Sequence, residues 1–248
     1  MKKRNLSKVT IALFAAAILL AGTGILGTRA AINSISPDYV SDFTTDSLDV
    51  TLMENGNDVA AQSGKLLTEL DGKAIPGKDY DEVLQVRNTS TTDQFVRVIV
   101  RKYWMKAETD ADGNTTYTKD LTKDPSLIIL TPAGGSDWKA NKAERTAERE
   151  VYYYTSALSS EAGENVSSPL VTNIKVDKSI MDEYATDTET VRDNTVTVYY
   201  YAYDGCVIGL EAEAQAVQTH SGADAVRSVW GATSIGVTVN GDTISVAD

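Results

Sequence analysis

Few residues in this chain have the types and spacing that catalysis requires. His220 is the single histidine among 248 residues, which excludes a His-Glu-x-x-His zinc site and any site with several histidines. A serine triad would need His220 as its base, but the chain contains no Gly-x-Ser-x-Gly sequence. His220 precedes an expected helix, where a surface or capping role is the simpler interpretation. We therefore expect a protein that is not an enzyme, with no catalytic residue and no cofactor.

One acidic stretch has some features of a calcium-binding loop. In Asp110-Ala-Asp-Gly-Asn114 the glycine lies at the fourth position instead of the sixth. The twelfth position, where such a loop has a glutamate, is Leu121. We interpret the stretch as the tip of a hairpin and expect no metal site.

Aromatic residues gather in three places, and a lone cysteine follows the last of them. The clusters at 103–104, 152–154 and 199–203 either line a carbohydrate-binding surface or pack in the core and across strands, and packing is the simpler interpretation. Cys206 has no partner for an intramolecular disulfide. We expect it to act as a small buried apolar residue and not as a reactive thiol.

Apolar residues alternate with polar ones along most of the chain, which is the period of β-strands. The expected strands are 47–53, 81–88, 94–104, 127–130, 145–156, 170–176, 195–203, 206–218 and the two arms of 236–246. Asp204-Gly205 is expected to join 195–203 and 206–218 as a hairpin. A short helix is expected over 221–230, with Ser221 as its cap and Gly231 past its end. This spacing predicts a mostly β protein, an antiparallel sandwich or jelly roll with one or two short helices.

The strongest strand signal, 94–104, leaves its register open. Either Phe95 or Val96 joins Val98 and Val100 in facing the core, while Arg97 and Arg101 face outward.

The first thirty residues have the order of a secretory signal peptide. Lys2, Lys3, Arg4 and Lys8 precede an uncharged apolar run over 9–21. Thr28 and Ala30 supply the small residues that a signal peptidase requires, so we predict cleavage between Ala30 and Ala31. The alternative is an uncleaved N-terminal anchor, but the run is shorter than the roughly 20 residues of a membrane span.

Cleavage would divide the chain into a signal peptide (1–30), an N-terminal segment (31–46) and one β-sandwich domain (47–248). It removes five of the 23 basic residues and none of the 35 acidic ones, so the formal net charge changes from −12 to −17. Such a surface repels nucleic acid and anionic lipid and attracts basic partners. We expect a secreted, extracellular or cell-surface protein with no nucleic-acid partner and no membrane contact after cleavage.

The cleavage region and a second stretch resemble one family of exported proteins. Gly22-Thr-Gly-Ile-Leu-Gly-Thr-Arg-Ala30, followed by Ala31-Ile-Asn-Ser-Ile35, is similar to the signals of TasA and camelysin-type proteins, which a SipW-type signal peptidase processes. Arg29 stands where that family often has an aromatic residue. The resemblance continues from Ile75 to Val98, where a Pro-Gly turn, a strand, an Asn-Thr loop and a second strand follow one another.

The resemblance implies a jelly-roll-like domain that assembles into extracellular fibres of a biofilm matrix. In such fibres the segment freed by cleavage adds as a strand to the next subunit. Here the donor would be Ala31 to Phe43, with Ile32, Ile35 and Val40 as anchors and Pro37 as a limit to uninterrupted pairing. Alternatively, this segment is the first strand of its own domain or a disordered tail. The peptidase activity associated with camelysin has no support in a chain with one histidine.

Two functional hypotheses follow. The first is a structural protein of the matrix or cell surface that associates with copies of itself. The second is a secreted β-sandwich module that binds carbohydrate or a surface partner through tyrosines and acidic loops.

The signal peptide yields the first testable prediction. N-terminal sequencing of the secreted protein is expected to begin at Ala31, because Thr28 and Ala30 fit the peptidase pocket. A product that begins at Met1 and remains with the membrane fraction would contradict it.

Overall fold

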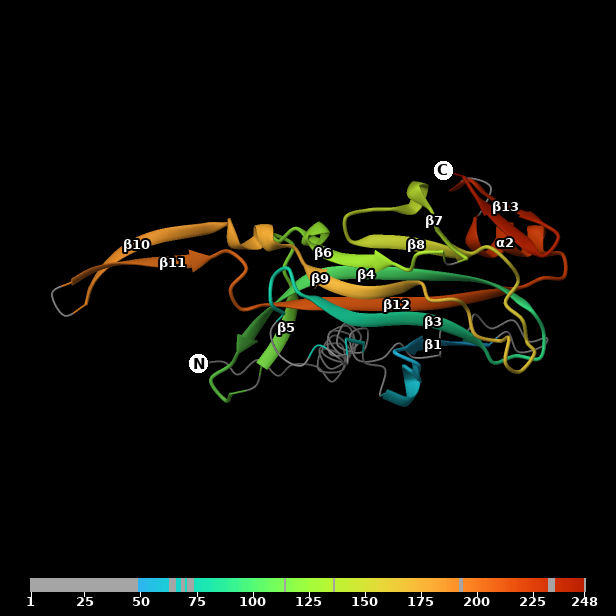
Figure 1. Cartoon of the computed structure of the whole chain (residues 1–248), viewed down its shortest axis with the longest axis horizontal. Helices are drawn as coiled ribbons and strands as arrows, with labels where there is room; N and C mark the ends of the chain where they lie inside the picture. Colours follow the sequence, from blue (N-terminus) through green and yellow to red (C-terminus); the bar gives the residue numbers. More distant parts are fainter. Residues whose placement is uncertain are drawn as a thin grey trace, which may run out of the picture.

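Two antiparallel sheets packed face to face form the body of the protein (Figure 1). The computed structural model describes residues 49–247, except 63–65, 68–69, 71–73, 114, 136, 192–193 and 232–234. The first sheet has the order β2-β1-β3-β9-β6, with strands Asn57–Asp58, Val50–Glu54, Asp79–Asn88, Val171–Val176 and Ile128–Pro132. The second has the order β12-β4-β8-β7, with strands Cys206–Gln218, Gln94–Thr109, Arg149–Tyr154 and Trp138–Ala140. The expected mostly β, antiparallel sandwich is confirmed.

The remaining elements extend or cover these sheets. Strand β5 (Thr115–Lys119) pairs with the far end of β4. Two further hairpins are β10 (Tyr184–Val191) with β11 (Asn194–Tyr201), and β13 (Val237–Asn240) with β14 (Thr243–Val246). Helix α2 (Gly222–Trp230) is the expected short helix. The short 3-10 turns are η1 (Ala60–Gln62), η2 (Pro125–Leu127), η3 (Lys142–Glu144) and η4 (Lys178–Met181).

Strand β4 is apolar on both faces and therefore belongs to two cores. Val96, Val98 and Val100 lie between the sheets in the main core, which settles the open register in favour of Val96. Phe95 and Ile99 point the opposite way, into a second core on the outer face of the same sheet. A single sandwich needs only one buried face per sheet, so the second apolar face requires a covering layer.

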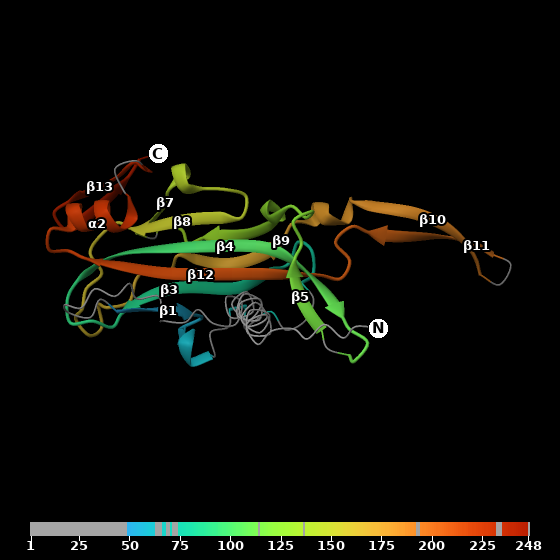
Figure 2. The ribbon, with the colours of Figure 1, turned by 180° about the vertical axis from the view of Figure 1, so that it is seen from behind.

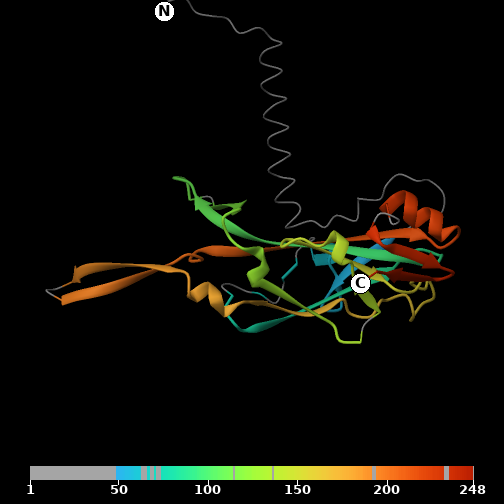
Figure 3. The same ribbon diagram turned by 90° about the horizontal axis from the view of Figure 1, so that it is seen from above.

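The C-terminal elements provide that layer. Figure 3 shows α2 and the β13–β14 hairpin lying over one end of the second sheet. Val226 and Trp230 of α2 pack there with Phe95 and Ile99. The approach is so close that a Cβ atom on Gly222 would lie 2.4 Å from the Phe95 ring, so the helix must begin with a glycine.

The ends of α2 match the expectation only in part. Gly231 ends the helix with a positive φ of 67°, as expected of a glycine in this position. Ser221 occupies the N-cap position, but its φ is 52° and its side chain makes no capping hydrogen bond. Its backbone carbonyl accepts from Asp224 and Ala225 instead.

The expected hairpin around Asp204-Gly205 is wrong. The chain does turn there, but β11 pairs with β10, while β12 pairs with β4 along its whole length. Residues 178–181 form the 3-10 turn η4, and β10 after it is absent from the expected strands. A strand takes its partner from hydrogen bonds and packing far away in sequence, and the turn alone does not fix that choice.

The main core gives a prediction about stability. Leu84 is 0% exposed between the sheets, so Leu84→Ala is expected to lower the free energy of unfolding by about 2 to 5 kcal/mol in urea denaturation. Leu121→Ala is the matched control because Leu121 is 80% exposed, and its cost is expected within about 0.5 kcal/mol. Equal costs for the two variants would contradict the assignment of the core.

Candidate assembly surfaces

The residues predicted from the sequence to act in cleavage and assembly lie outside the described part of the chain. They are Thr28, Ala30, Ala31, Ile32, Ile35 and Val40. Their roles stay predictions. The described residues can show, however, whether the body offers a sheet edge to which a strand could be added.

The long edge strand β12 offers such an edge. Among the described strands its 13 residues pair with β4 alone, and the register runs without a bulge from Cys206 to Gln218. An edge of this length presents a row of backbone N–H and C=O groups to any strand that approaches it. No proline interrupts β12.

The side chains on the inward face of β12 become smaller toward the C-terminal end of the strand. Ile208 and Leu210 are buried in the main core, and Ala212, Ala214 and Ala216 follow on the same face. Ala214 and Ala216 are only half-buried. The second half of this edge therefore contributes only small apolar side chains to the core.

The outward face of β12 is held to β4 by polar contacts. The Tyr103 hydroxyl donates to Glu211 at 2.7 Å, and Arg101 lies 3.6 Å from Glu213. Burial and the bond to Glu211 raise the pKa of Tyr103 well above its ordinary value. The Tyr103 ring also covers Gly209, where a Cβ atom would lie 2.3 Å from it. These contacts fix the edge strand in place without using its outer backbone groups.

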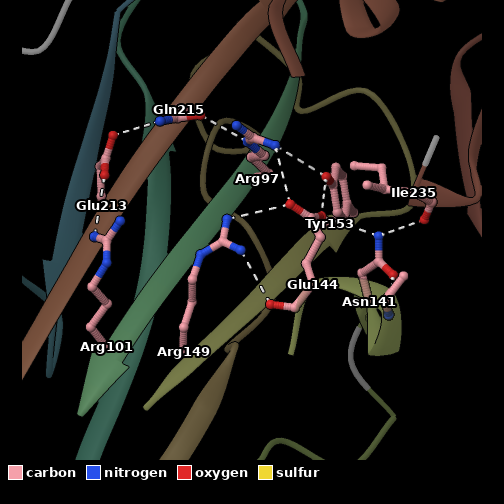
Figure 4. Close-up of polar contacts among 10 residues, drawn as sticks. Arg97, Arg101, Asn141, Glu144, Arg149, Tyr153, Glu213, Gln215 and Ile235 are labelled. Carbon is pink, nitrogen blue, oxygen red and sulfur yellow. Dashed lines mark hydrogen bonds and ion pairs between the residues drawn. The ribbon is translucent and has the colours of Figure 1, made fainter. Parts of the chain in front are cut away.

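A buried polar network continues from β12 toward the C-terminal layer (Figure 4). Arg97 donates to Gln215 at 2.8 Å and to the Tyr153 hydroxyl at 3.2 Å, and its guanidinium lies over the Trp230 ring at 5.0 Å. Tyr153 in turn donates to Glu144 at 2.7 Å. Burial and that bond raise the pKa of Tyr153 from 10.0 to about 12.

The same network reaches the loop before β13. Asn141 donates to Glu144 at 3.1 Å and to the Ile235 carbonyl at 2.9 Å. Arg149 contacts the opposite Glu144 oxygen at 3.3 Å. Removing one member would leave a buried charge without its partner, so the network holds the covering layer in one position. Arg97, expected to face outward, does so but lies under this layer.

The opposite side of the sandwich is closed to strand addition by several features. Its edge strands are β6, which ends at Pro132, and β7, which has three residues. The buried Lys102 ammonium donates to the Ile128 carbonyl of β6 at 2.5 Å, and burial lowers the pKa of Lys102. Short strands, proline and lysine are the means by which natural sheets protect their edges.

A cleft of about 380 Å³ lies between β6 and β7. Its polar side chains already satisfy one another, since the Tyr152 hydroxyl donates to Glu150 and Arg145 lies 3.0 Å from Glu150. These polar groups therefore need no ligand as a partner.

The other candidate residues lie apart from one another. His220 is exposed, and Asp110 accepts from the Asp112 backbone at the tip of the β4–β5 hairpin, as expected. Cys206 is half-buried against the main core, and burial raises the pKa of its thiol. Within the described ranges, no three His, Cys, Asp or Glu side chains gather where they could hold a metal ion.

The aromatic clusters divide between the two interpretations. Trp104 and the tyrosines at 152–154 are buried, so core packing is confirmed for them. Tyr203 is buried in the main core, whereas Tyr199, Tyr200 and Tyr201 are exposed on β11, where core packing is wrong. Cross-strand packing holds for Tyr199 and Tyr201. Tyr184, which the sequence interpretation did not single out, joins them. The alternation of Thr and Tyr over 184–201 is the sequence pattern that could have predicted these exposed strands.

No protein-family model, curated protein or solved structure matches this chain. In the portion that the structure describes, no helix has the length and apolar character needed to cross a membrane.

The polar network gives a prediction about pH. Tyr153→Phe is expected to lower the free energy of unfolding by about 1 to 3 kcal/mol at pH 8, because Glu144 loses a buried donor. Above pH 10 the unfolded tyrosine of the parent ionises while the folded one keeps its proton to about 12, so the parent loses stability in that window. The difference between variant and parent should therefore narrow as the pH rises from 10 to 12.

Urea denaturation at pH 8 and at several values up to pH 12 measures this effect. Tyr117→Phe alters a tyrosine that is 43% exposed and is the matched control. A difference between parent and Tyr153→Phe that stays constant with pH would contradict the proposed bond.

Proposed function

We propose that this protein is a secreted structural protein of the extracellular matrix or cell surface, and that its copies assemble by adding a strand to β12. The observation that supports the proposal most is the contrast between the two sides of the sandwich. One side carries short and protected edge strands, whereas the other ends in a regular 13-residue strand. Main-chain hydrogen bonds along such an edge supply affinity, and pockets for alternate side chains supply specificity.

The donor is the N-terminal segment 31–46. It is joined through few residues to β1, which starts at Val50 and lies next to β12 across the sandwich. Strand β1, the first described strand after this segment, therefore lies beside the kind of edge that the segment would complete. Pairing with β12 of the next copy, and not of the same chain, makes a head-to-tail contact that repeats into a fibre.

The side chains of donor and acceptor are complementary in size. The inward side chains of the acceptor strand become small at Ala212, Ala214 and Ala216. The donor supplies Ile32, Ile35 and Val40 as larger apolar anchors. Burial of an isoleucine or valine side chain contributes about 1.5 to 3 kcal/mol.

The resemblance of the signal region to TasA and camelysin-type proteins agrees with this proposal. Processing by a SipW-type peptidase would free the donor only after export. The acidic surface, with a net charge of −17 after cleavage, keeps copies apart by repulsion until a specific contact forms.

The assembly proposal predicts the behaviour of the purified mature chain. A protein that starts at Ala31 is expected to form filaments in electron microscopy and to sediment as large particles. Deletion of 31–37 should leave soluble, folded monomers, because two of the three anchors are lost.

Two variants with the same added charge distinguish the loss of the apolar anchors from the effect of the negative charge. Ile32→Asp with Ile35→Asp is expected to prevent filaments, while Asn33→Asp with Ser36→Asp adds the same charge and should assemble more readily. Filaments that form equally in both variants, or that survive the deletion, would refute the donor role.

A further inference from the structure

The hairpin of β10 and β11 extends from one end of the body as a two-stranded ribbon, here called the arm (residues 184–201; Figures 1 and 2). Its two strands pair with each other and with no other described strand. An isolated two-stranded hairpin is at best marginally stable in water, so its side chains must hold it together. The tyrosines do so, with Tyr184 packed edge-on against Tyr199 at 5.2 Å and against Tyr201 at 5.9 Å.

Six described residues that share one face of the arm are uncharged. Tyr184 lies opposite Tyr201, Thr186 opposite Tyr199, and Thr188 opposite Thr197. Because side chains of opposed residues share a face and alternate along each strand, these six residues form one surface, here called the tyrosine–threonine face. Tyr184, Tyr199 and Tyr201 are 51%, 52% and 39% exposed. The reverse face carries Asp187 and Tyr200.

We propose that the tyrosine–threonine face binds a neutral polysaccharide. Half-exposed aromatic rings offer flat apolar surface on which sugar rings stack, and hydroxyl groups on tyrosine and threonine donate and accept hydrogen bonds. Tyrosine also loses little conformational entropy on binding. The face is open and ribbon-shaped, which suits an extended chain of sugars more than a small molecule that needs a pocket.

The size of the face disfavours a second protein as its occupant. Five described residues per strand span about 17 Å and two strands about 10 Å, so the flat footprint of the face is about 170 Å², and the accessible area of its side chains is a few hundred Å². A stable protein interface buries about 800 Å² on each partner. A second copy of this acidic chain would also bring its own negative charge close.

The charges on the arm favour a neutral ligand. The six residues of the tyrosine–threonine face are uncharged, and Asp187 on the reverse face adds negative charge, which disfavours an anionic polymer. A cationic polymer would be attracted to the reverse face, where Asp187 lies, and would not need the tyrosines. This inference is separate from the assembly of copies through β12, which uses other residues.

Affinity electrophoresis of the secreted protein tests the proposal, with native gels that contain hydroxyethylcellulose, laminarin or dextran. Retardation is expected in at least one of these neutral polysaccharides, and Tyr184→Ser with Tyr199→Ser should weaken it at least tenfold. Tyr200→Ser is the matched control, because Tyr200 is 51% exposed on the reverse face, and it should bind like the parent.

A second variant controls for unfolding of the arm, because it keeps the aromatic rings that pack its two strands together. Tyr184→Phe with Tyr199→Phe keeps the rings and is expected to retain most of the binding, whereas a binding loss equal to that of the serine variant would refute stacking. No retardation in any of the three gels, or equal retardation of parent and serine variant, would overturn the proposal. A dimer in sedimentation that the serine variant abolishes, without retardation in the gels, would overturn it in favour of self-association.

Discussion

The antiparallel pairing of β4 with β12 is the interaction on which the rest of the structure depends. These strands supply inward residues to the main core and outward residues to the second core, so one ladder stabilises both faces of the sheet. The contacts of Arg97, Arg101 and Tyr103 with β12 add side-chain bonds to the backbone ladder. In the covering layer α2 contacts β12, while the β13–β14 hairpin contacts β8, the other neighbour of β4. Loss of the ladder would therefore expose apolar surface on both sides.

The sequence predicts those parts of the fold that depend on local pattern. The alternation in β4 and β12, the Asn240-Gly241 turn and the helix before Gly231 all lie where the residues place them. Partner choice is different, because Asp204-Gly205 has good turn chemistry yet separates two strands that pair elsewhere. The burial of Arg97 could not be foreseen either, since it requires Trp230, which lies far along the chain. The open edge of the candidate site follows only from sheet order, which alternation does not encode.

Different surfaces of the protein have different proposed roles. Proline, lysine and short strands close the β6 and β7 side, and the polar network fixes the outer face under α2. This leaves the edge of β12 for a strand and the arm for a ligand without charge. A strongly acidic protein gains from such a division, because repulsion limits contact to the places where backbone or uncharged groups meet.

Residue-resolved hydrogen exchange along β12 tests the central claim, that this edge is open before assembly, most directly. In an antiparallel edge strand alternate amides donate to the neighbouring strand, while the others face outward. In dilute protein that starts at Ala31, every second amide from Cys206 to Gln218 should exchange slowly and the intervening ones quickly, with the quick set becoming slow in filaments. Uniform slow exchange along β12 in the monomer would contradict the account, because it would show that another strand already covers the edge.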